Sequence, residues 1–140
     1  MSKPEKKQGS AAVIGIGASA GGLEALQQFF DYMPSDSGLS FVVIQHLSPD
    51  YKSLMADILA KHTDMTVRQA EDGMPVRPDH LYLIPPKKNL TLHEGRLVLS
   101  DYDASALNHP IDIFFTSLAE EKREKAIVVV LSGTGSDGTN

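Results

Sequence analysis

Short apolar runs alternate with stretches of helical periodicity over the first part of the chain. Residues 11–16 and 39–45 are nearly all apolar, as in parallel strands that are covered on both faces. Each run is followed by apolar residues at helical spacing, namely Leu23, Leu26, Phe29, Phe30 and Met33, and then Tyr51, Leu54, Met55, Ile58 and Leu59. Pro34 closes the first of these helices. The alternation predicts βαβ units and hence a parallel sheet.

The middle of the chain differs because short strand patterns follow one another there without a helical pattern between them. They cover 66–69, 80–84, 90–93 and 96–99, and turn signals at Asp72-Gly73, Pro85-Pro86 and Glu94-Gly95 divide them. The last two strands flank Glu94-Gly95, which predicts a β-hairpin. Part of the sheet is therefore expected to be antiparallel or appended.

A helix and one more strand are predicted after a polar loop over 101–109. Pro110 opens the helix, whose apolar face carries Ile111, Phe114, Phe115 and Leu118, and 126–131 is the most apolar strand of all. The whole pattern predicts an α/β fold, with a three-layer, doubly wound, mostly parallel sheet and a small antiparallel hairpin. The sequence stops where a further helix should follow, so we expect this fold to be incomplete at its C-terminus.

Composition narrows the range of partners. The chain has 140 residues, enough for one domain, and its net charge of -5 gives no electrostatic reason to expect nucleic acid or an anionic membrane surface. It has no cysteine, and its histidines show no metal-ligand spacing, so no metal or cofactor is expected. Residues 1–10 are polar and lysine-rich without a following signal-type hydrophobic run. We expect them to form a disordered leader on a cytoplasmic protein, with the folded domain over 11–140.

The joint between the first strand and the first helix carries the pattern G-x-S-x-G, from Gly17 through Ser19 to Gly21. This pattern is typical of a nucleophile elbow, in which a serine lies on a tight strand-to-helix turn. An ester oxygen placed against Ser19 would face the positive end of the following helix, which stabilises developing negative charge.

Three other interpretations of this joint remain open. It is typical of a structural glycine turn, and an isolated G-x-S-x-G favours that interpretation. The spacing Gly15-x-Gly17-x-x-Ala20 also half fits a dinucleotide fingerprint, but the second strand ends in Gln45-His46 where an acidic residue is wanted. A phosphate-binding loop matches only as far as Gly22, because Leu23 stands where the lysine should be.

Three residues with complementary chemistry follow the three strongest strands. Ser19, His46 and Asp137 each come one to six residues past a strand end. Because the carboxyl ends of parallel strands meet at the same edge of a sheet, we expect the three to lie close together. The serine would be the nucleophile, the histidine its base, and the aspartate the group that orients the imidazole. Taken singly, His46 is more typical of a hydrogen-bonded loop residue and Asp137 of a turn.

Several linked motifs occur in an order that resembles the catalytic domain of the chemotaxis protein-glutamate methylesterases, the CheB family. They are Gly17-Ala18-Ser19-Ala20-Gly21-Gly22-Leu23, Gln45-His46-Leu47, Leu81-Tyr82-Leu83-Ile84-Pro85-Pro86, His109-Pro110-Ile111-Asp112 and Leu131-Ser132-Gly133-Thr134-Gly135-Ser136-Asp137-Gly138. The chain looks most like the version at the amino terminus of fusions between this methylesterase and a CheR methyltransferase.

The resemblance implies a function and a set of site residues. It implies hydrolysis of glutamate γ-methyl esters on the cytoplasmic helices of methylated chemoreceptors, with release of methanol, and sometimes deamidation of glutamine. The family's triad falls on Ser19, His46 and Asp137, and its oxyanion hole on the backbone N–H groups of Ala20 and Thr134. A CheR-type methyltransferase is the implied partner. A non-catalytic regulatory or receptor-docking domain and a nucleotide-binding module are the competing hypotheses.

Overall fold

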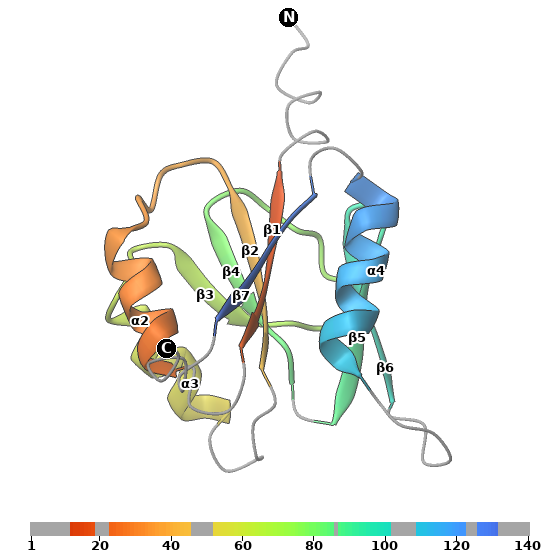
Figure 1. Ribbon diagram of the computed structural model, residues 1–140, viewed down its shortest axis with the longest axis horizontal. Helices are drawn as coiled ribbons and strands as arrows, with labels where there is room; N and C mark the ends of the chain where they lie inside the picture. Colours follow the sequence, from red (N-terminus) through yellow and green to blue (C-terminus); the bar gives the residue numbers. More distant parts are fainter. Residues whose placement is uncertain are drawn as a thin grey trace, which may run out of the picture.

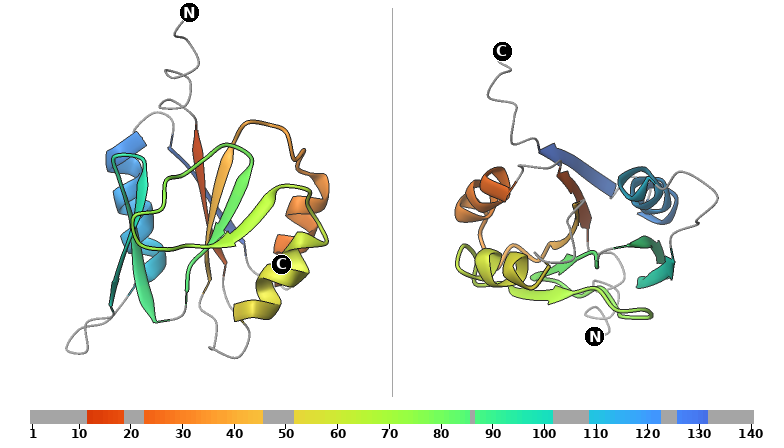
Figure 2. Two further views of the ribbon diagram at one scale, coloured as in Figure 1. Left: turned by 180° about the vertical axis from the view of Figure 1, so that it is seen from behind. Right: turned by 90° about the horizontal axis from the view of Figure 1, so that it is seen from below.

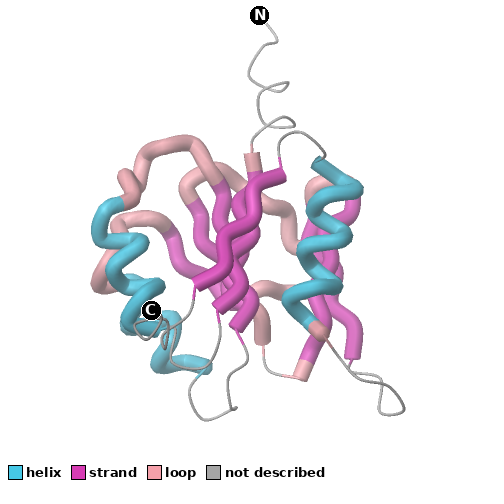
Figure 3. The backbone as a smooth tube through the Cα atoms, viewed as in Figure 1, coloured by secondary structure: helices cyan, strands magenta, loops and turns pink. Residues whose placement is uncertain are grey.

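The computed structural model describes residues 12–18, 23–45, 52–85, 87–101, 109–122 and 126–131 (Figures 1 and 3). In chain order its elements are β1 (Val13–Ala18), α2 (Leu23–Tyr32), β2 (Ser40–Gln45), α3 (Lys52–Ala60), β3 (Thr66–Gln69), β4 (His80–Leu83), β5 (Lys88–His93), β6 (Arg96–Asp101), α4 (Pro110–Lys122) and β7 (Ala126–Leu131). The elements expected from the sequence are thus all present, although β1 lies two residues later than its apolar pattern suggested.

The strands form one parallel sheet and one separate hairpin. The larger sheet has the order β3-β4-β2-β1-β7, and every neighbouring pair in it is parallel. β5 and β6 pair with each other in antiparallel register around Glu94 and Gly95, both of which have positive φ. The short strands of the middle region therefore divide: β3 and β4 extend the parallel sheet, and the hairpin is appended to it.

Helices cover both faces of the parallel sheet, which gives the expected three layers (Figure 2). α2 and α3 cover one face, where Leu26, Phe30 and Leu59 are fully buried against β1 and β2. α4 covers the other face, and there the side chains of Phe114 and Leu118 share a core with those of the β5–β6 hairpin. The protein is a doubly wound α/β fold with one apolar core on each side of the sheet.

β1 and β2 are central strands, and the burial of their side chains shows it. Every residue of both strands is buried, including Ser40, whose hydroxyl donates to the Arg77 carbonyl at 2.7 Å. β7 lies at the end of the strand order and is more open, with Val128 and Val130 exposed by 50% and 72%. A continuous run of apolar residues therefore identified the strands correctly without separating the centre of the sheet from its edge.

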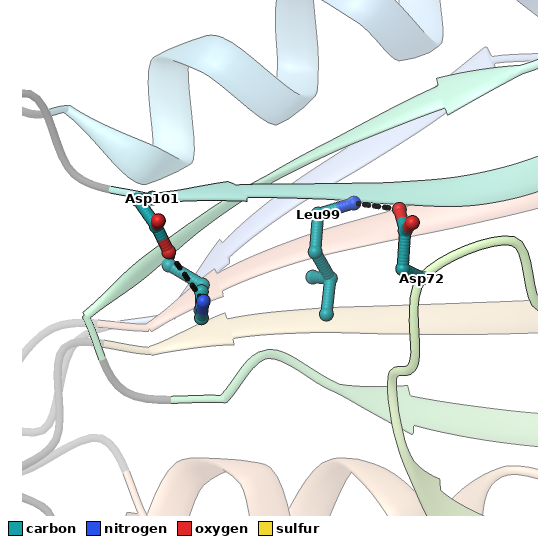
Figure 4. Close-up of polar contacts among 4 residues, drawn as sticks. Asp72, Leu99 and Asp101 are labelled. Atoms are coloured by element: carbon teal, nitrogen blue, oxygen red, sulfur yellow. Dashed lines mark hydrogen bonds and ion pairs between the residues drawn. The ribbon is translucent and has the colours of Figure 1, made fainter.

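The hairpin is fastened to the body of the protein by backbone and side-chain contacts. The Leu99 N–H donates to the Asp72 carboxylate at 2.9 Å (Figure 4). The Leu97 N–H donates to the Met74 carbonyl at 2.8 Å. Within the hairpin, Lys88 donates to the Asp101 carboxylate, and this hydrogen bond lowers the pKa of Asp101. The contacts with Asp72 and Met74 thus fix the hairpin to the segment between β3 and β4.

The loop before β4 is organised around Asp79 and Tyr82. Asp79 has a φ of 60°, and its carboxylate accepts the Gly38 N–H at 2.7 Å. The Tyr82 hydroxyl accepts the Arg77 N–H at 2.9 Å and donates to the Pro75 carbonyl at 3.2 Å. Burial raises the pKa of Tyr82, because the charged phenolate is poorly solvated there.

Candidate active site

Three strands of the parallel sheet end level with one another. Ala18, the last residue of β1, is the register partner of Gln45 in β2 on one side and of Leu131 in β7 on the other. Gln45 and Leu131 are themselves the last residues of their strands. Because all three strands run in the same direction, their carboxyl ends form one rim, at the lower edge of the sheet in Figure 1. We call this edge the β1–β2–β7 rim.

The five site residues predicted from the sequence, Ser19, His46, Asp137, Ala20 and Thr134, lie outside the described residues. The structure does define the points from which the chain leads to them. Ser19 and His46 directly follow the paired residues Ala18 and Gln45. Neighbouring strands lie about 4.8 Å apart, so the chain enters these two positions from adjacent points.

Asp137 is six residues beyond Leu131, the other register partner of Ala18. Six residues of extended chain span at most about 20 Å. The strand ends are closer than that, since Leu131 is one strand spacing of about 4.8 Å from Ala18 and two from Gln45. The distance that the 132–137 segment must cover is therefore well within its reach.

The start of α4 lies beside the β1–β2–β7 rim, because this helix packs closely on β1. A Cβ added at Gly17 would lie 2.9 Å from Ile111 Cγ2, and one added at Gly15 would lie 3.0 Å from Leu118 Cδ2. Glycine at both positions lets α4 approach the strand more closely than a side chain would permit. Ile111 is in the first turn of α4, so this contact holds the N-terminal end of the helix beside the end of β1.

Gly17 lies inside β1 and is absent from the residues with positive φ among those described. Its missing side chain here serves the close approach of α4. A sequence signal for the observed role did exist. Gly15 and Gly17 alternate along an apolar strand, which puts both on the same face and leaves that face open for a helix.

The same contacts weigh against the dinucleotide interpretation. A dinucleotide fingerprint uses its first two glycines for the turn and for close approach of the pyrophosphate. Here Gly15 and Gly17 are within the strand, and α4 side chains occupy the space above them. β2 also ends in Gln45, a buried amide in place of the carboxylate that would hold a ribose.

Two polar side chains accompany Ile111 at this end of α4. His109 directly precedes the helix, as expected from the sequence, and Asp112 lies in its first turn, where a negative charge is stabilised by the helix dipole. Both side chains are exposed.

In the described part of the chain, no group of three or more His, Cys, Asp or Glu residues is arranged to hold a metal ion. The helices described there are also too short or too polar to cross a membrane.

Comparison with known families identifies the family to which this chain belongs. A family model described as CheB methylesterase matches residues 14–140. The chain belongs to the CheB methylesterase family, as the motifs in the sequence indicated. The match includes β1, β2 and β7 together with the segments that follow them.

Relatives in several bacteria are named as methylesterases. Proteins called protein-glutamate methylesterase/protein-glutamine glutaminase are 31% identical over 140 residues in Treponema denticola and 33% identical over 134 residues in Escherichia coli K12. These alignments cover 96% and 92% of this chain, and 38% of each relative. An uncharacterized 104.1 kDa protein of Rhodobacter capsulatus is 49% identical over 85 residues, which are 61% of this chain and 9% of that protein. The chain thus spans less than two fifths of the length of these relatives.

A solved structure agrees with the fold described above. The CheB methylesterase catalytic domain of Thermotoga maritima superposes with a TM-score of 0.76 at 28% sequence identity. The superposition covers 86% of this chain and 67% of that one. This chain therefore shares the α/β fold of that catalytic domain over the part that superposes.

Proposed function

We propose that this chain hydrolyses glutamate γ-methyl esters on the cytoplasmic helices of methylated chemoreceptors and releases methanol. The observation that carries the proposal is the pairing of Ala18 with both Gln45 and Leu131. It brings the three strand ends that precede Ser19, His46 and Asp137 to the β1–β2–β7 rim. Membership of the CheB family supports this assignment, as does the activity for which the Treponema and Escherichia relatives are named.

In the proposed first half-reaction, the Ser19 hydroxyl oxygen attacks the ester carbonyl while His46 accepts the hydroxyl proton. Asp137 orients the imidazole and stabilises its protonated form. The backbone N–H groups of Ala20 and Thr134 stabilise the negative charge on the tetrahedral intermediate. Its collapse breaks the bond to the methoxy group, which leaves as methanol with the proton from His46.

In the second half-reaction, water attacks the glutamyl ester formed on Ser19, and His46 again serves as the base. Collapse of the second tetrahedral intermediate frees the glutamate carboxylate and returns the proton to Ser19. A primary amide in place of the ester would release ammonia by the same route. We therefore include glutamine deamidation in the proposal, in keeping with the second half of the relatives' name.

The proposed partners follow from the substrate. The receptor helices are one partner, and a CheR-type methyltransferase that forms the esters is the other, either separate or fused in a longer protein. The Rhodobacter relative supports the placement of such a segment in a longer protein, because only 9% of its length corresponds to this sequence. Receptor helices of this kind place the reaction in the cytoplasm.

The direct test is methanol release from a methylated receptor fragment by the full-length gene product, before and after Ser19→Ala. The variant should lose turnover and keep the circular dichroism spectrum of the parent. Retained methanol release in Ser19→Ala would refute the assignment of the nucleophile. No turnover by the parent protein would instead favour a non-catalytic receptor-docking domain.

A further inference from the structure

A surface groove runs along α4 on the side that faces the hairpin. It has a volume of about 500 Å³, which is within the range of binding pockets in proteins. Most of its lining comes from one flank of the helix, and β5 contributes the opposite wall; the residues are Thr91, His109, Asp112, Ile113, Thr116, Ser117 and Glu120. We call it the α4–β5 groove.

The two walls of the groove are held together by hydrogen bonds. The Ser117 hydroxyl accepts the Leu92 N–H of β5 at 3.0 Å and donates to the Phe114 carbonyl, also at 3.0 Å. At the far end of the helix, the Glu121 carboxylate accepts the Gly95 N–H at 3.1 Å. These bonds tie α4 to the C-terminal end of β5 and to the turn that follows it, so the groove is already formed without a ligand.

Two carboxylates define the charge of the groove. Asp112 and Glu120 are both exposed, and neither takes part in an ion pair among the residues that the structure describes. They are eight residues apart on one helix, which corresponds to about 12 Å along its axis. Between them the surface is formed by Ile113 and by threonine side chains, so it can accept the aliphatic part of a long cationic side chain.

One end of the groove lies at the β1–β2–β7 rim. His109 and Asp112 belong to the end of α4 at which Ile111 contacts Gly17, two residues before Ser19. Glu120 belongs to the opposite end of the helix. A polypeptide that reaches the rim can therefore continue along the groove for the length of α4.

We propose that the α4–β5 groove docks the substrate helix through two basic side chains, one on Asp112 and one on Glu120. This inference rests on the proposed function, because it takes the ester-bearing polypeptide as the occupant. The two carboxylates of the groove favour a cationic partner, and the 12 Å spacing matches lysine or arginine residues eight positions apart on a second helix that runs alongside α4.

The test measures binding separately from chemistry. The probe is a synthetic helical peptide that carries one glutamate γ-methyl ester and two lysines eight residues apart, and a second peptide has glutamines in place of the lysines. Binding is followed by fluorescence anisotropy with the full-length protein in the Ser19→Ala background, so that the ester stays intact. Asp112→Asn with Glu120→Gln removes both groove charges. Asp64→Asn with Glu71→Gln removes two exposed charges elsewhere and serves as the matched control.

The groove variant should weaken binding of the lysine peptide about fivefold and reduce its salt dependence, while binding of the glutamine peptide should not change. The control variant should leave the binding of both peptides unchanged. Equal binding of the two peptides, or equal effects of the two variants, would overturn the proposal. Self-association of the protein that only the groove variant abolishes would also overturn it, because the occupant would then be a second copy. Hydrolysis of a small ester such as N-acetylglutamate γ-methyl ester tests the chemistry independently, and its absence would refute the proposed function without bearing on the groove.

Discussion

Ala18 and Gln45 are register partners at the ends of two adjacent parallel strands, and each is followed directly by a residue of the proposed catalytic triad. This pairing requires β1 and β2 to stop at the same level. A shift of the register by two residues would separate the two strand ends by about 7 Å along the strand direction. The proposed chemistry of Ser19 and His46 therefore depends on the alignment of the sheet as well as on the identity of the loop residues.

The contact between Gly17 and Ile111 predicts a pair of coupled substitutions. Gly17→Ala should lower the free energy of unfolding by about 1–3 kcal/mol, because the new methyl group would overlap Ile111 Cγ2. Ile111→Ala removes that atom, so the double variant should recover about 0.5–2 kcal/mol relative to the sum of the single effects. Denaturant unfolding of the four proteins measures the coupling.

Ile111→Val is the matched control for this cycle, because valine keeps both γ carbons and loses only Cδ1. The clash with the Gly17→Ala methyl group should persist, and little recovery is expected. Strict additivity of Gly17→Ala and Ile111→Ala would show that the close approach of α4 to β1 is not set by this contact.

The conformation and hydrogen bond of Asp79 predict that two substitutions at this position differ in their effect on stability. It has a φ of 60°, and its carboxylate accepts the Gly38 N–H at 2.7 Å. Asp79→Ala loses the hydrogen bond and places a residue without a polar side chain in the left-handed region, so stability should fall by about 2 kcal/mol. Asp79→Asn keeps an acceptor oxygen and tolerates that φ, so its effect should be well under half as large. Thermal unfolding of the two variants checks the order, and equal losses would contradict it.

Tyr82 predicts how stability responds to alkaline pH. Burial raises its pKa above the ordinary tyrosine value of 10.0, so the folded protein holds the phenol proton more tightly than the unfolded chain does. The stabilising contribution is complete below pH 10 and is lost as the pH rises through the folded-state pKa. The free energy of unfolding should therefore fall less steeply above pH 10 in Tyr82→Phe than in the parent protein.

Tyr32→Phe is the control for the alkaline measurement, since the Tyr32 side chain is 87% exposed. Its pH profile should follow that of the parent. Tyr82→Phe should also be less stable at neutral pH by about 1–3 kcal/mol, because the Arg77 N–H loses its acceptor and the Pro75 carbonyl its donor. Parallel profiles for all three proteins above pH 10 would contradict the role assigned to burial.

Much of this architecture could be predicted from the sequence because its signals are local. Apolar runs, helix periodicity and the Glu94-Gly95 turn sufficed for the parallel sheet and the hairpin. An appended hairpin was among the expectations, but the sequence did not show that β3 and β4 would join the parallel sheet, because they have the same short, turn-bounded patterns as β5 and β6. The contact of Gly17 with Ile111 also escaped prediction, since it joins positions 94 residues apart and depends on how closely a helix packs on a strand.

The candidate site also has a part that the sequence predicted and a part that it did not. Small residues after an apolar strand indicated the rim, and the register of Ala18 with Gln45 and Leu131 agrees with that expectation. The assignments of Ser19, His46, Asp137, Ala20 and Thr134 stay predictions. The α4–β5 groove had no sequence signal, because its walls come from Thr91 on one side and from residues 109–120 on the other.

The most direct test of the account is covalent labelling of the full-length protein with a serine-directed fluorophosphonate, followed by mass spectrometry of the modified peptide. The account predicts a label on Ser19 that is absent in Ser19→Ala and strongly reduced in His46→Ala, because the histidine must take up the serine proton. A label on another residue, or undiminished labelling of Ser19 in His46→Ala, would contradict the convergence of these two residues at the β1–β2–β7 rim.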